Sequence, residues 1–399
     1  MCPTGVSPAS HANPSRRRST SSANSVDPAR DSGTRRSVPV GLAGTPDKQY
    51  KRTPHGIGDV TSPLFGVYND PDRMAVIERM ERWLGTSHAI QNVFTPWTPG
   101  AIDELFDRIL PSIRAAGRVP LLTWEPFTPT PDATPTDIAA RIAAGEHDEY
   151  LDRWADRLAA WLAGPDGELG TADDRRLYLR LAHEMNGDWY PWSPAVGGNG
   201  GRTTADPSAY IGMWRHVHDR IERAGIDSAH CQWLWCVNHV DVGGASLEDC
   251  YPGDAFVDWL GVDGFNWGNS RGWSAWRSPA AVFDDALDRL AHLADKPIAV
   301  PEFASTSLTT NGHDPARKAA WIRAAYAYLD GASVALACWF NEDKETDWAT
   351  FGGERGTERV ADDPSYEAYA TYRAALVDGD RAEPPASRLV SDAAFLGRG

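Results

Sequence analysis

Residues 180–192 read RLAHEMNGDWYPW, and this stretch decides the fold of the chain. It continues an apolar strand that begins near 177, and it ends in acidic, imidazole, amide and aromatic groups. Strand-forming residues stop at Glu184, and the Asn-Gly pair at 186–187 is typical of a turn. The pattern places a carboxylic acid at the carboxyl end of a strand, where parallel α/β proteins carry their active sites. The alternative is a strand that merely ends in a polar loop.

Seven further apolar segments resemble the strand that ends at Glu184, and helical patterns separate them. The eight predicted strands are 64–68, 88–94, 118–124, 177–184, 232–238, 257–267, 297–303 and 334–340. The helical patterns lie near 71–84, 100–116, 134–163, 207–224, 314–330 and 363–377. Strands separated by helices pair in parallel through right-handed crossovers. Eight such units predict an α/β fold with a single (β/α)8 TIM barrel. A doubly wound open sheet would need a Gly-rich loop after the first strand, and residues 68–71 contain no glycine.

Composition divides the chain into three parts. Residues 1–53 are rich in Ser, Arg and Pro, and we expect a disordered tail because they can bury little apolar surface. Residues 54–378 form the predicted catalytic barrel, and residues 379–399 are expected to be a loose C-terminal tail. The arginines at 16–18 and 35–36 are not followed by the apolar segment of an export signal, so the sequence shows no clear signal peptide.

The charge of the chain limits its partners. The total is −16, and residues 1–53 carry nine basic and three acidic residues, so the rest carries −22. Such a body is expected to bind neither nucleic acid nor an anionic membrane. Five cysteines show no metal-binding spacing, which favours free thiols and no metal or other cofactor. A Gly/Asp-rich loop at 164–174 could hold calcium, but its spacing matches no EF-hand, and a solvated turn is favoured.

Two glutamates at strand ends indicate the chemistry. Glu184 ends the fourth strand and Glu302 the seventh, and these strands face each other across the mouth of a barrel. Two carboxyl groups that flank one bond are the equipment for glycoside hydrolysis, in which one is protonated and the other ionised. Arg180 shares strand parity with Glu184, so we expect it to point inward beneath it. Its guanidinium could hold a carboxylate ionised or form an ordinary barrel ion pair.

The same residues resemble a known family. Residues 180–192 are similar to the acid/base signature of glycoside hydrolase family 26, His-Glu-x-Asn-Gly-x-Trp-Tyr-Pro-Trp. Residues 296–306 resemble the nucleophile strand of that family and residues 257–267 its sixth strand, and the whole resemblance covers roughly residues 60–375. It implies a retaining mechanism with Glu184 as the acid/base and Glu302 as the nucleophile.

The substrate-binding candidates come from two sources. The resemblance implies that His183 and Trp189 bind the sugar at the cleavage point and that Asp263 and Trp339 line the same subsite. Position at a strand end adds three further candidates, which are Trp124, Asn238 and Trp267. Aromatic rings suit this task because the apolar C–H faces of sugars lie flat on them.

Two positions depart from the family pattern. The sixth strand of the family usually ends Gly-Tyr-Asn-Trp, and the tyrosine hydroxyl bonds to the nucleophile, whereas this chain has Phe265. Phe340 follows Trp339 where mannan-cleaving members often carry arginine. These departures bear on rate and substrate, and they leave the assignment of the two glutamates unchanged.

The resemblance implies an endo-β-glycanase, most often an endo-β-1,4-mannanase. The alternatives are a β-1,3-xylanase, a mixed-linkage β-glucanase, and a polysaccharide-binding protein that has lost catalysis. A metal-dependent hydrolase would need clustered ligands, and only His183 and His239 end neighbouring strands. We expect a monomer that acts on a β-linked polysaccharide in an extracellular or cell-surface location.

Overall fold

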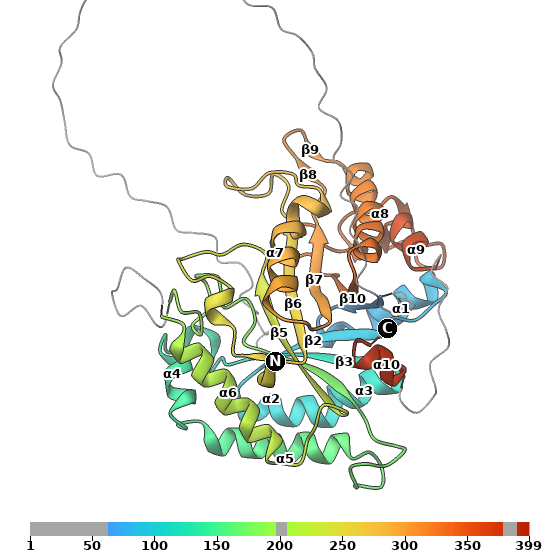
Figure 1. Ribbon diagram of the computed structural model, residues 1–399. Coiled ribbons are helices and arrows are strands. Elements are labelled where there is room, and N and C mark those ends of the chain that lie inside the picture. The colour runs from blue at the N-terminus through green and yellow to red at the C-terminus, as the bar shows by residue number, and fades with distance from the viewer. Residues whose placement is uncertain (1–62, 197–205, 378–388, 399) are drawn as a thin grey trace, which may run out of the picture. The chain divides into compact units, whose positions relative to one another are not determined.

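The computed structural model describes residues 63–196, 206–377 and 389–398, and Figure 1 shows a barrel of strands surrounded by helices. The barrel strands are parallel and close in the order β1-β10-β7-β6-β5-β4-β3-β2. Their bounds are β1 Leu64–Tyr68, β2 Ile90–Pro96, β3 Val119–Glu125, β4 Leu177–Leu181, β5 Cys231–Asn238, β6 Trp259–Asn266, β7 Ile298–Ser305 and β10 Val334–Phe340. The predicted (β/α)8 barrel is confirmed. The predicted tail at 1–53 lies outside the described residues.

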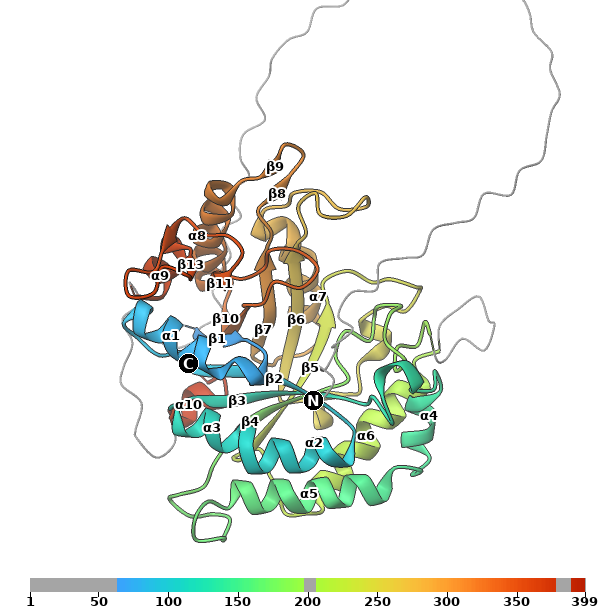
Figure 2. The same cartoon turned by 180° about the vertical axis from the view of Figure 1, so that it is seen from behind.

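Helices cover the outside of the barrel, as Figures 1 and 2 show from opposite sides. They are α1 Met74–Leu84, α2 Pro99–Glu104, α3 Leu110–Ala115, α4 Ile138–Ala143, α5 Asp148–Leu162, α6 Ser208–Glu222, α7 Pro279–Leu293, α8 Pro315–Gly331 and α9 Ala370–Val377. A π-helical turn, Leu105–Ile109, joins α2 to α3. Short 3-10 helices are Pro71–Arg73, Pro131–Ala133, Glu248–Cys250 and Asp254–Phe256. Within the described ranges, none of the helices has the length and apolar character needed to cross a membrane.

Three helix predictions need correction. The pattern at 134–163 forms two helices, α4 and α5, with a break at 144–147. The helix expected at 363–377 begins only at 370, because Glu367–Ala368 (β13) pairs with Phe351–Gly353 (β11) and Glu358–Arg359 (β12) in a small antiparallel sheet. Helix α7 was not predicted, although Ser278 caps its first turn and Pro279 occupies its first position. A two-stranded hairpin, β8 Leu308–Thr309 and β9 Gly312–His313, follows β7.

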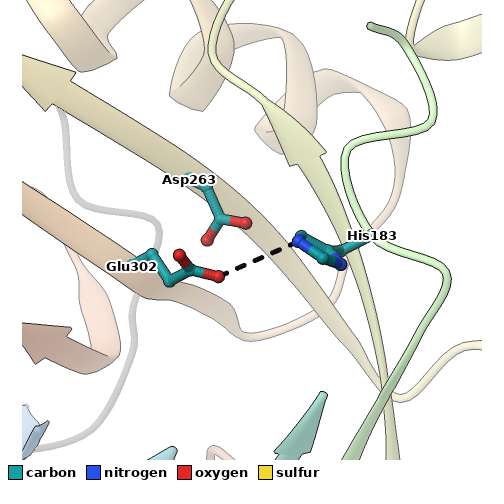
Figure 3. A group of neighbouring side chains, drawn as sticks. All are labelled: His183, Asp263 and Glu302. Atoms are coloured by element: carbon teal, nitrogen blue, oxygen red, sulfur yellow. Dashed lines mark ion pairs between the residues drawn. The ribbon is translucent and has the colours of Figure 1, made fainter. Parts of the chain in front are cut away.

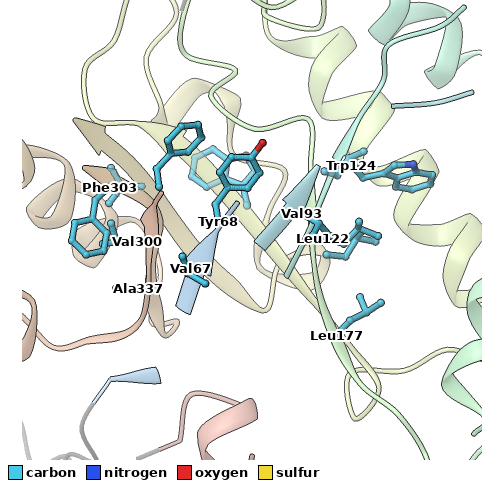
Figure 4. Close-up of a cluster of buried hydrophobic side chains, with 14 of the residues drawn as sticks. Val67, Tyr68, Val93, Leu122, Trp124, Leu177, Val300, Phe303 and Ala337 are labelled. Carbon is cyan, nitrogen blue, oxygen red and sulfur yellow. The ribbon is translucent and has the colours of Figure 1, made fainter. Parts of the chain in front are cut away.

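The barrel packs two separate apolar layers. Outward-facing strand residues such as Val67, Val93 and Leu122 join the helices in a large cluster, part of which is drawn in Figure 4. Inward-facing residues form a second cluster that contains Leu121, Tyr178, Leu234, Trp259 and Leu336. This inner cluster fills the end of the barrel where the strands begin. It leaves the polar inward-facing residues of the same strands at the opposite end, where the candidate site lies.

The C-terminal end contradicts the expected loose tail for residues 389–398. This segment forms a short helix, α10 Asp392–Phe395, and Phe395 is buried. The Phe395 ring lies 4.9 Å from the ring of Tyr178, and the Tyr178 hydroxyl donates to the Phe395 carbonyl at 3.2 Å. Arg176 also pairs with Asp392 at 2.8 Å. The segment therefore covers the strand-start end of the barrel, opposite the site, and burial of Phe395 provides the driving force.

Candidate active site

Glu302 lies on β7 and points into the barrel, where a buried arginine meets it. The Arg180 Nη2 donates to Glu302 Oε1, and Nη1 donates to Asp263 Oδ2 at 2.6 Å. Arg180 is fully buried and comes from β4, so it links β4 to β6 and β7. The predicted inward orientation of Arg180 is confirmed. Its guanidinium therefore binds the Glu302 carboxyl group from inside the barrel.

The guanidinium of Arg180 is fixed from beneath. The Thr123 hydroxyl accepts from Arg180 Nε at 2.9 Å and from Nη2 at 2.6 Å. The same hydroxyl donates to Asn92 Oδ1 at 2.9 Å, so its one donor and both acceptor positions are occupied. Burial alone would lower the pKa of Arg180, but Asp263 and Glu302 together raise it well above its usual range. Arg180 is therefore a fixed positive charge under the barrel mouth.

The backbone turns sharply where β4 ends, and this turn positions the second glutamate. Ala182 and Glu184 have left-handed conformations, with φ of 44° and 53°. Such a conformation costs a residue with a side chain roughly 1–3 kcal/mol. Two backbone bonds hold the turn in place, from the Ala182 N–H to the Trp124 carbonyl at 3.0 Å and from the Glu184 N–H to the Cys236 carbonyl at 2.9 Å. The strand therefore ends at Leu181, three residues earlier than predicted.

Glu184 is held in a form suited to proton donation. Its Oε2 accepts from Trp189 Nε1 at 3.0 Å, and its side chain is buried. Burial and then the charge of Glu302 raise its pKa to about 8, although the bond from Trp189 acts in the opposite direction. At neutral pH this glutamate carries a proton. The site thus combines a protonated acid with a second glutamate that is bound to a guanidinium.

His183 directly precedes Glu184 in the sequence, and its ring lies close to Glu302. Figure 3 shows its ring directed at Glu302 and Asp263, with Nε2 4.0 Å from Glu302 Oε1. The Tyr190 hydroxyl lies 3.0 Å from the same nitrogen. Burial and then the charge of Arg180 lower the pKa of His183 well below its usual value. The imidazole is therefore neutral, and it can serve as a hydrogen-bonding group without adding charge to the site.

The loop after Glu184 is braced by its own aromatic residues. A Cβ at Gly187 would lie 2.5 Å from the Trp189 ring, so only glycine allows Trp189 to reach Glu184. The Trp192 Nε1 donates to the His183 carbonyl at 2.9 Å, and the Trp192 ring stacks on Tyr190 at 4.3 Å. Tyr190 and Trp192 are buried, so they support the loop. Trp189 is half-buried and remains within reach of a ligand.

Comparison with protein-family models matches residues 129–304 to glycosyl hydrolase family 26. Endoglucanase H of Acetivibrio thermocellus is 35% identical over 267 residues, which cover 66% of this chain and 25% of that protein. Residues 129–304 therefore belong to glycoside hydrolase family 26. A beta-1,3-xylanase of Alcaligenes sp. is 25% identical over 164 residues, which cover 39% of this chain and 29% of that protein. The chain thus spans between a quarter and a third of the curated relatives it matches.

Solved structures agree on the fold. A GH26 beta-mannanase from Bacteroides ovatus has a TM-score of 0.51 at 17% identity, with 81% of this chain and 89% of that chain covered. A protein titled GH26C from Muricauda sp. has a TM-score of 0.55 at 16% identity, with 83% of this chain and 90% of that chain covered. At these identities the structures support a shared barrel and leave the substrate open.

Two predicted substrate-binding residues do not point into the barrel. Trp124 is fully buried and stacks on Trp154 of α5 at 3.9 Å. Trp339 is also fully buried, with its ring 5.0 Å from Phe303 and 6.1 Å from Trp321 of α8. Side chains alternate along a strand, and the neighbours of these residues point inward, so both tryptophans point outward to the helices.

The other predicted binding residues lie nearer the barrel mouth. Asp263 is fully buried beneath Glu302, where its oxygen accepts from Arg180, so it anchors the guanidinium. Asn238 ends β5, and its Nδ2 donates to the Val240 carbonyl at 2.6 Å. Trp267 follows β6 and is half-buried, with its ring 4.8 Å from the ring of Trp348.

The structure adds three residues to those that were assigned a role from the sequence. Glu125 ends β3 and is buried, and its charge contributes to the raised pKa of Glu184. Tyr68 ends β1, and its ring lies 4.8 Å from Phe94. Trp348 comes from the loop after β10 and packs 5.1 Å from Phe265. Glu125 shares strand parity with Thr123, so alternation along β3 would have found it.

The structure confirms that Phe265 departs from the family pattern. It also shows that the effect of this departure on Glu302 is small. Its ring contacts Phe340 at 5.7 Å and Trp348 at 5.1 Å, so the position that usually supplies a hydroxyl is apolar. Glu302 nevertheless has a strong donor, because Arg180 contacts it from below. The nucleophile candidate is therefore oriented without the tyrosine.

One group of site residues has ligand atoms close enough for a metal ion, but its charges argue against one. The ligand atoms of His183, Asp263 and Glu302 lie within 4.8 Å of one another. Arg180 already donates to both carboxylates, so a cation there would be repelled at close range. The loop at 164–174 uses Asp174 to accept from the N–H groups of Gly170 and Thr171, as in a hydrogen-bonded turn.

Replacing Glu184 should stabilise the fold in a pH-dependent way. Because the pKa of Glu184 is raised from 4.5 to about 8, the folded state binds an extra proton between these values. Ionisation of the buried Glu184 lowers the free energy of unfolding. This loss is absent below pH 4.5 and complete above about pH 8. We expect Glu184→Gln to raise the free energy of unfolding by roughly 4 kcal/mol at pH 8 and to change it little at pH 4.5.

The measurement is urea unfolding of wild type and variant at both pH values. Glu149→Gln, at an exposed position on α5, is the matched control and should change stability by less than about 0.5 kcal/mol at either pH. A Glu184→Gln effect of equal size at pH 4.5 and pH 8 would show that Glu184 is not protonated in the folded state.

Proposed function

We propose that this chain is a retaining endo-β-glycanase. The observation that carries the proposal is the pairing of a protonated Glu184 with a Glu302 that is bound by Arg180 in one barrel mouth. Family 26 membership supports glycosidic bond hydrolysis as the reaction. All of these groups come from one chain, so a monomer contains a complete site. Polysaccharide chains are too large to enter a cell, so we propose that the protein acts outside it.

The mechanism follows from the two carboxyl groups. A Glu302 oxygen attacks the anomeric carbon, the bond to the leaving sugar breaks, and Glu184 gives its proton to the leaving oxygen. The product is a glycosyl ester on Glu302. Glu184, now ionised, takes a proton from a water molecule, and this water attacks the anomeric carbon and releases Glu302. Trp189 occupies Glu184 Oε2, which leaves Oε1 for the transferred proton.

The neutral His183 fits a role beside the reacting sugar. Its Nε2 lies near Glu302, where a hydroxyl of the sugar in the cleavage subsite would be placed. A neutral ring can bond that hydroxyl and leave the charge balance between Glu184 and Glu302 undisturbed. We therefore propose His183 and Trp189 as the sugar contacts at the cleavage point.

For the backbone sugar we propose β-1,4-linked mannan first, on the resemblance of residues 180–192 to the signature of family 26. Mixed-linkage β-glucan is the second candidate, because the relative with 35% identity is named Endoglucanase H. A β-1,3-xylan substrate has weaker support, since the relative named for it is 25% identical. Phe265 and Phe340 are the two positions where this chain departs from mannan-cleaving members.

A substrate panel tests the proposal. Purified protein is incubated with mannan, glucomannan, mixed-linkage β-glucan, β-1,3-xylan and β-1,4-xylan, and reducing ends and product sizes are measured. We expect one β-linked polysaccharide to be cut into oligosaccharides of several lengths, as an endo-acting enzyme does. Retention on a polysaccharide gel without any released ends would favour a binding protein that has lost catalysis. Release of single sugars only would contradict endo action.

A further inference from the structure

Trp273 is an exposed aromatic residue that the mechanism does not use. Of the large apolar side chains in the described residues, only Val240, Trp273 and Val377 are exposed, and Trp273 is 62% exposed. Folding normally buries tryptophan, since its ring offers the largest apolar area of any side chain. An exposed ring of this size on a single loop therefore marks a candidate contact surface.

A run of aromatic rings connects Trp273 to the barrel mouth. The Trp273 ring lies 5.6 Å from Trp267, and Trp267 lies 4.8 Å from Trp348. Trp348 lies 5.1 Å from Phe265, which follows Asp263 by two residues on β6 and points the same way. The run therefore begins above the buried Arg180–Asp263–Glu302 cluster and ends at an exposed ring.

The loop that carries Trp273 is held by its own hydrogen bonds. The Ser274 hydroxyl donates to the Gly268 carbonyl at 2.9 Å, and the Ser270 hydroxyl donates to the Trp267 carbonyl at 2.7 Å. The Asn269 N–H bonds to the Leu308 carbonyl at 3.0 Å, which ties the loop to the β8–β9 hairpin. A ring displayed on a braced loop loses little conformational freedom when a ligand binds.

The loop that carries the exposed ring also carries polar residues. The guanidinium of Arg271 lies over the Trp267 ring, with its carbon 5.4 Å from the ring centre. Within the described residues, Arg271 Nε has no hydrogen-bond partner. Asn269 and Ser270 lie on the same loop. A flat exposed ring whose neighbour Trp267 carries a guanidinium on one face matches a sugar, which presents an apolar face and a rim of hydroxyl groups.

We infer that Trp273, with Trp267 and Arg271, forms a sugar-stacking subsite away from the cleavage point, which binds a distant unit of the polysaccharide. This inference rests on the proposed function, because a distant subsite affects the reaction only if a polysaccharide is cleaved at Glu302. It makes Trp273 a specificity residue that favours long chains over short oligosaccharides. The effect should appear only on substrates long enough to reach it.

The test compares Trp273→Ala and Trp273→Phe with wild type on the polysaccharide that the panel identifies and on the shortest oligosaccharide that wild type cleaves. We expect Trp273→Ala to lower kcat/KM on the polysaccharide about 10-fold and on the short substrate by less than about twofold. Trp273→Phe should restore most of the activity on the polysaccharide. Val377→Ala, which removes another exposed apolar side chain, is the control and should change neither.

Two results would overturn the inference. One is an unchanged kcat/KM on the polysaccharide, and the other is an equal loss on both substrates, which would mean that Trp273 only supports the structure of the site. If wild type cleaves nothing, the proposed function fails, and the subsite is then tested by binding alone. Wild type should be retarded in gels that contain the cognate polysaccharide and Trp273→Ala should not, and equal mobility of the two would contradict the inference.

Discussion

Glu302→Ala should reduce hydrolysis by a factor of about 10⁴ or more, because no other group can form the bond to the anomeric carbon. Glu302 lies on β7, where Arg180 contacts one of its oxygens from below and His183 lies 4.0 Å away. The loss should appear in kcat rather than KM, since the bond that Glu302 makes exists only after attack has begun. Initial rates on the cognate polysaccharide give the measurement.

The control separates chemistry from folding. Circular dichroism and thermal unfolding of Glu302→Ala should show an intact barrel, because the substitution removes one buried charge and leaves Arg180 paired with Asp263. Glu149→Gln on the exposed face of α5 should retain wild-type rates. If Glu302→Ala keeps more than about a hundredth of wild-type activity while folded, Glu302 is not the nucleophile.

Arg180→Met should lower the free energy of unfolding by roughly 3–5 kcal/mol at neutral pH and abolish activity. The methionine side chain is of similar length, so the main loss is the positive charge. It would leave Asp263 and Glu302 buried side by side without a counter-charge. Activity would fall because Glu302 would lose the hydrogen-bond donor that orients it.

The pH dependence of this effect has a definite sign. Burial already raises the pKa of Asp263 and the charge of Arg180 opposes this, so without Arg180 the folded variant binds a proton at Asp263 still more readily than the unfolded chain does. The folded variant therefore loses stability as pH rises above about 4, where free carboxyl groups ionise. Urea unfolding at pH 4 and pH 7 should show a smaller difference from wild type at the lower value.

Arg108→Met provides a matched control. Arg108 also contacts two carboxylates, Asp72 at 3.1 Å and Glu104 at 2.5 Å, but these groups are exposed. Its loss should cost less than about 1 kcal/mol, since water screens surface pairs. A cost for Arg180→Met as small as that for Arg108→Met would contradict the view that one guanidinium neutralises two buried acids.

The strand ends and the inward arginine could be predicted from the sequence because both follow from local patterns. Apolar runs that end in acids mark the carboxyl ends of strands, which placed Glu184 and Glu302 at one mouth. Alternation along β4 placed Arg180 beneath Glu184. The partners of Arg180 needed the structure, since Asp263 and Glu302 lie more than 80 residues away and their approach depends on barrel closure.

The same alternation rule explains the errors. Position at a strand end suggests Trp124, and the family resemblance suggests Trp339. Each lies next to a residue that points inward, so alternation directs them outward to α5 and α8. Trp348 could not be placed because it lies on a loop, and no local pattern fixes the path of that loop. Residues 392–395 pack through Phe395 on Tyr178, which is a contact between distant parts of the chain that no local pattern indicates.

The central claim is that Glu184 and Glu302 have different roles, and azide rescue tests it most directly. Glu184→Ala and Glu302→Ala are each supplied with an activated aryl β-glycoside of the cognate sugar and with sodium azide, and the anomeric configuration of the product is read by proton NMR. Two successive inversions predict a β-glycosyl azide from Glu184→Ala, and one inversion predicts an α-glycosyl azide from Glu302→Ala. Exchanged configurations, or azide products from neither variant while both stay folded, would contradict the account.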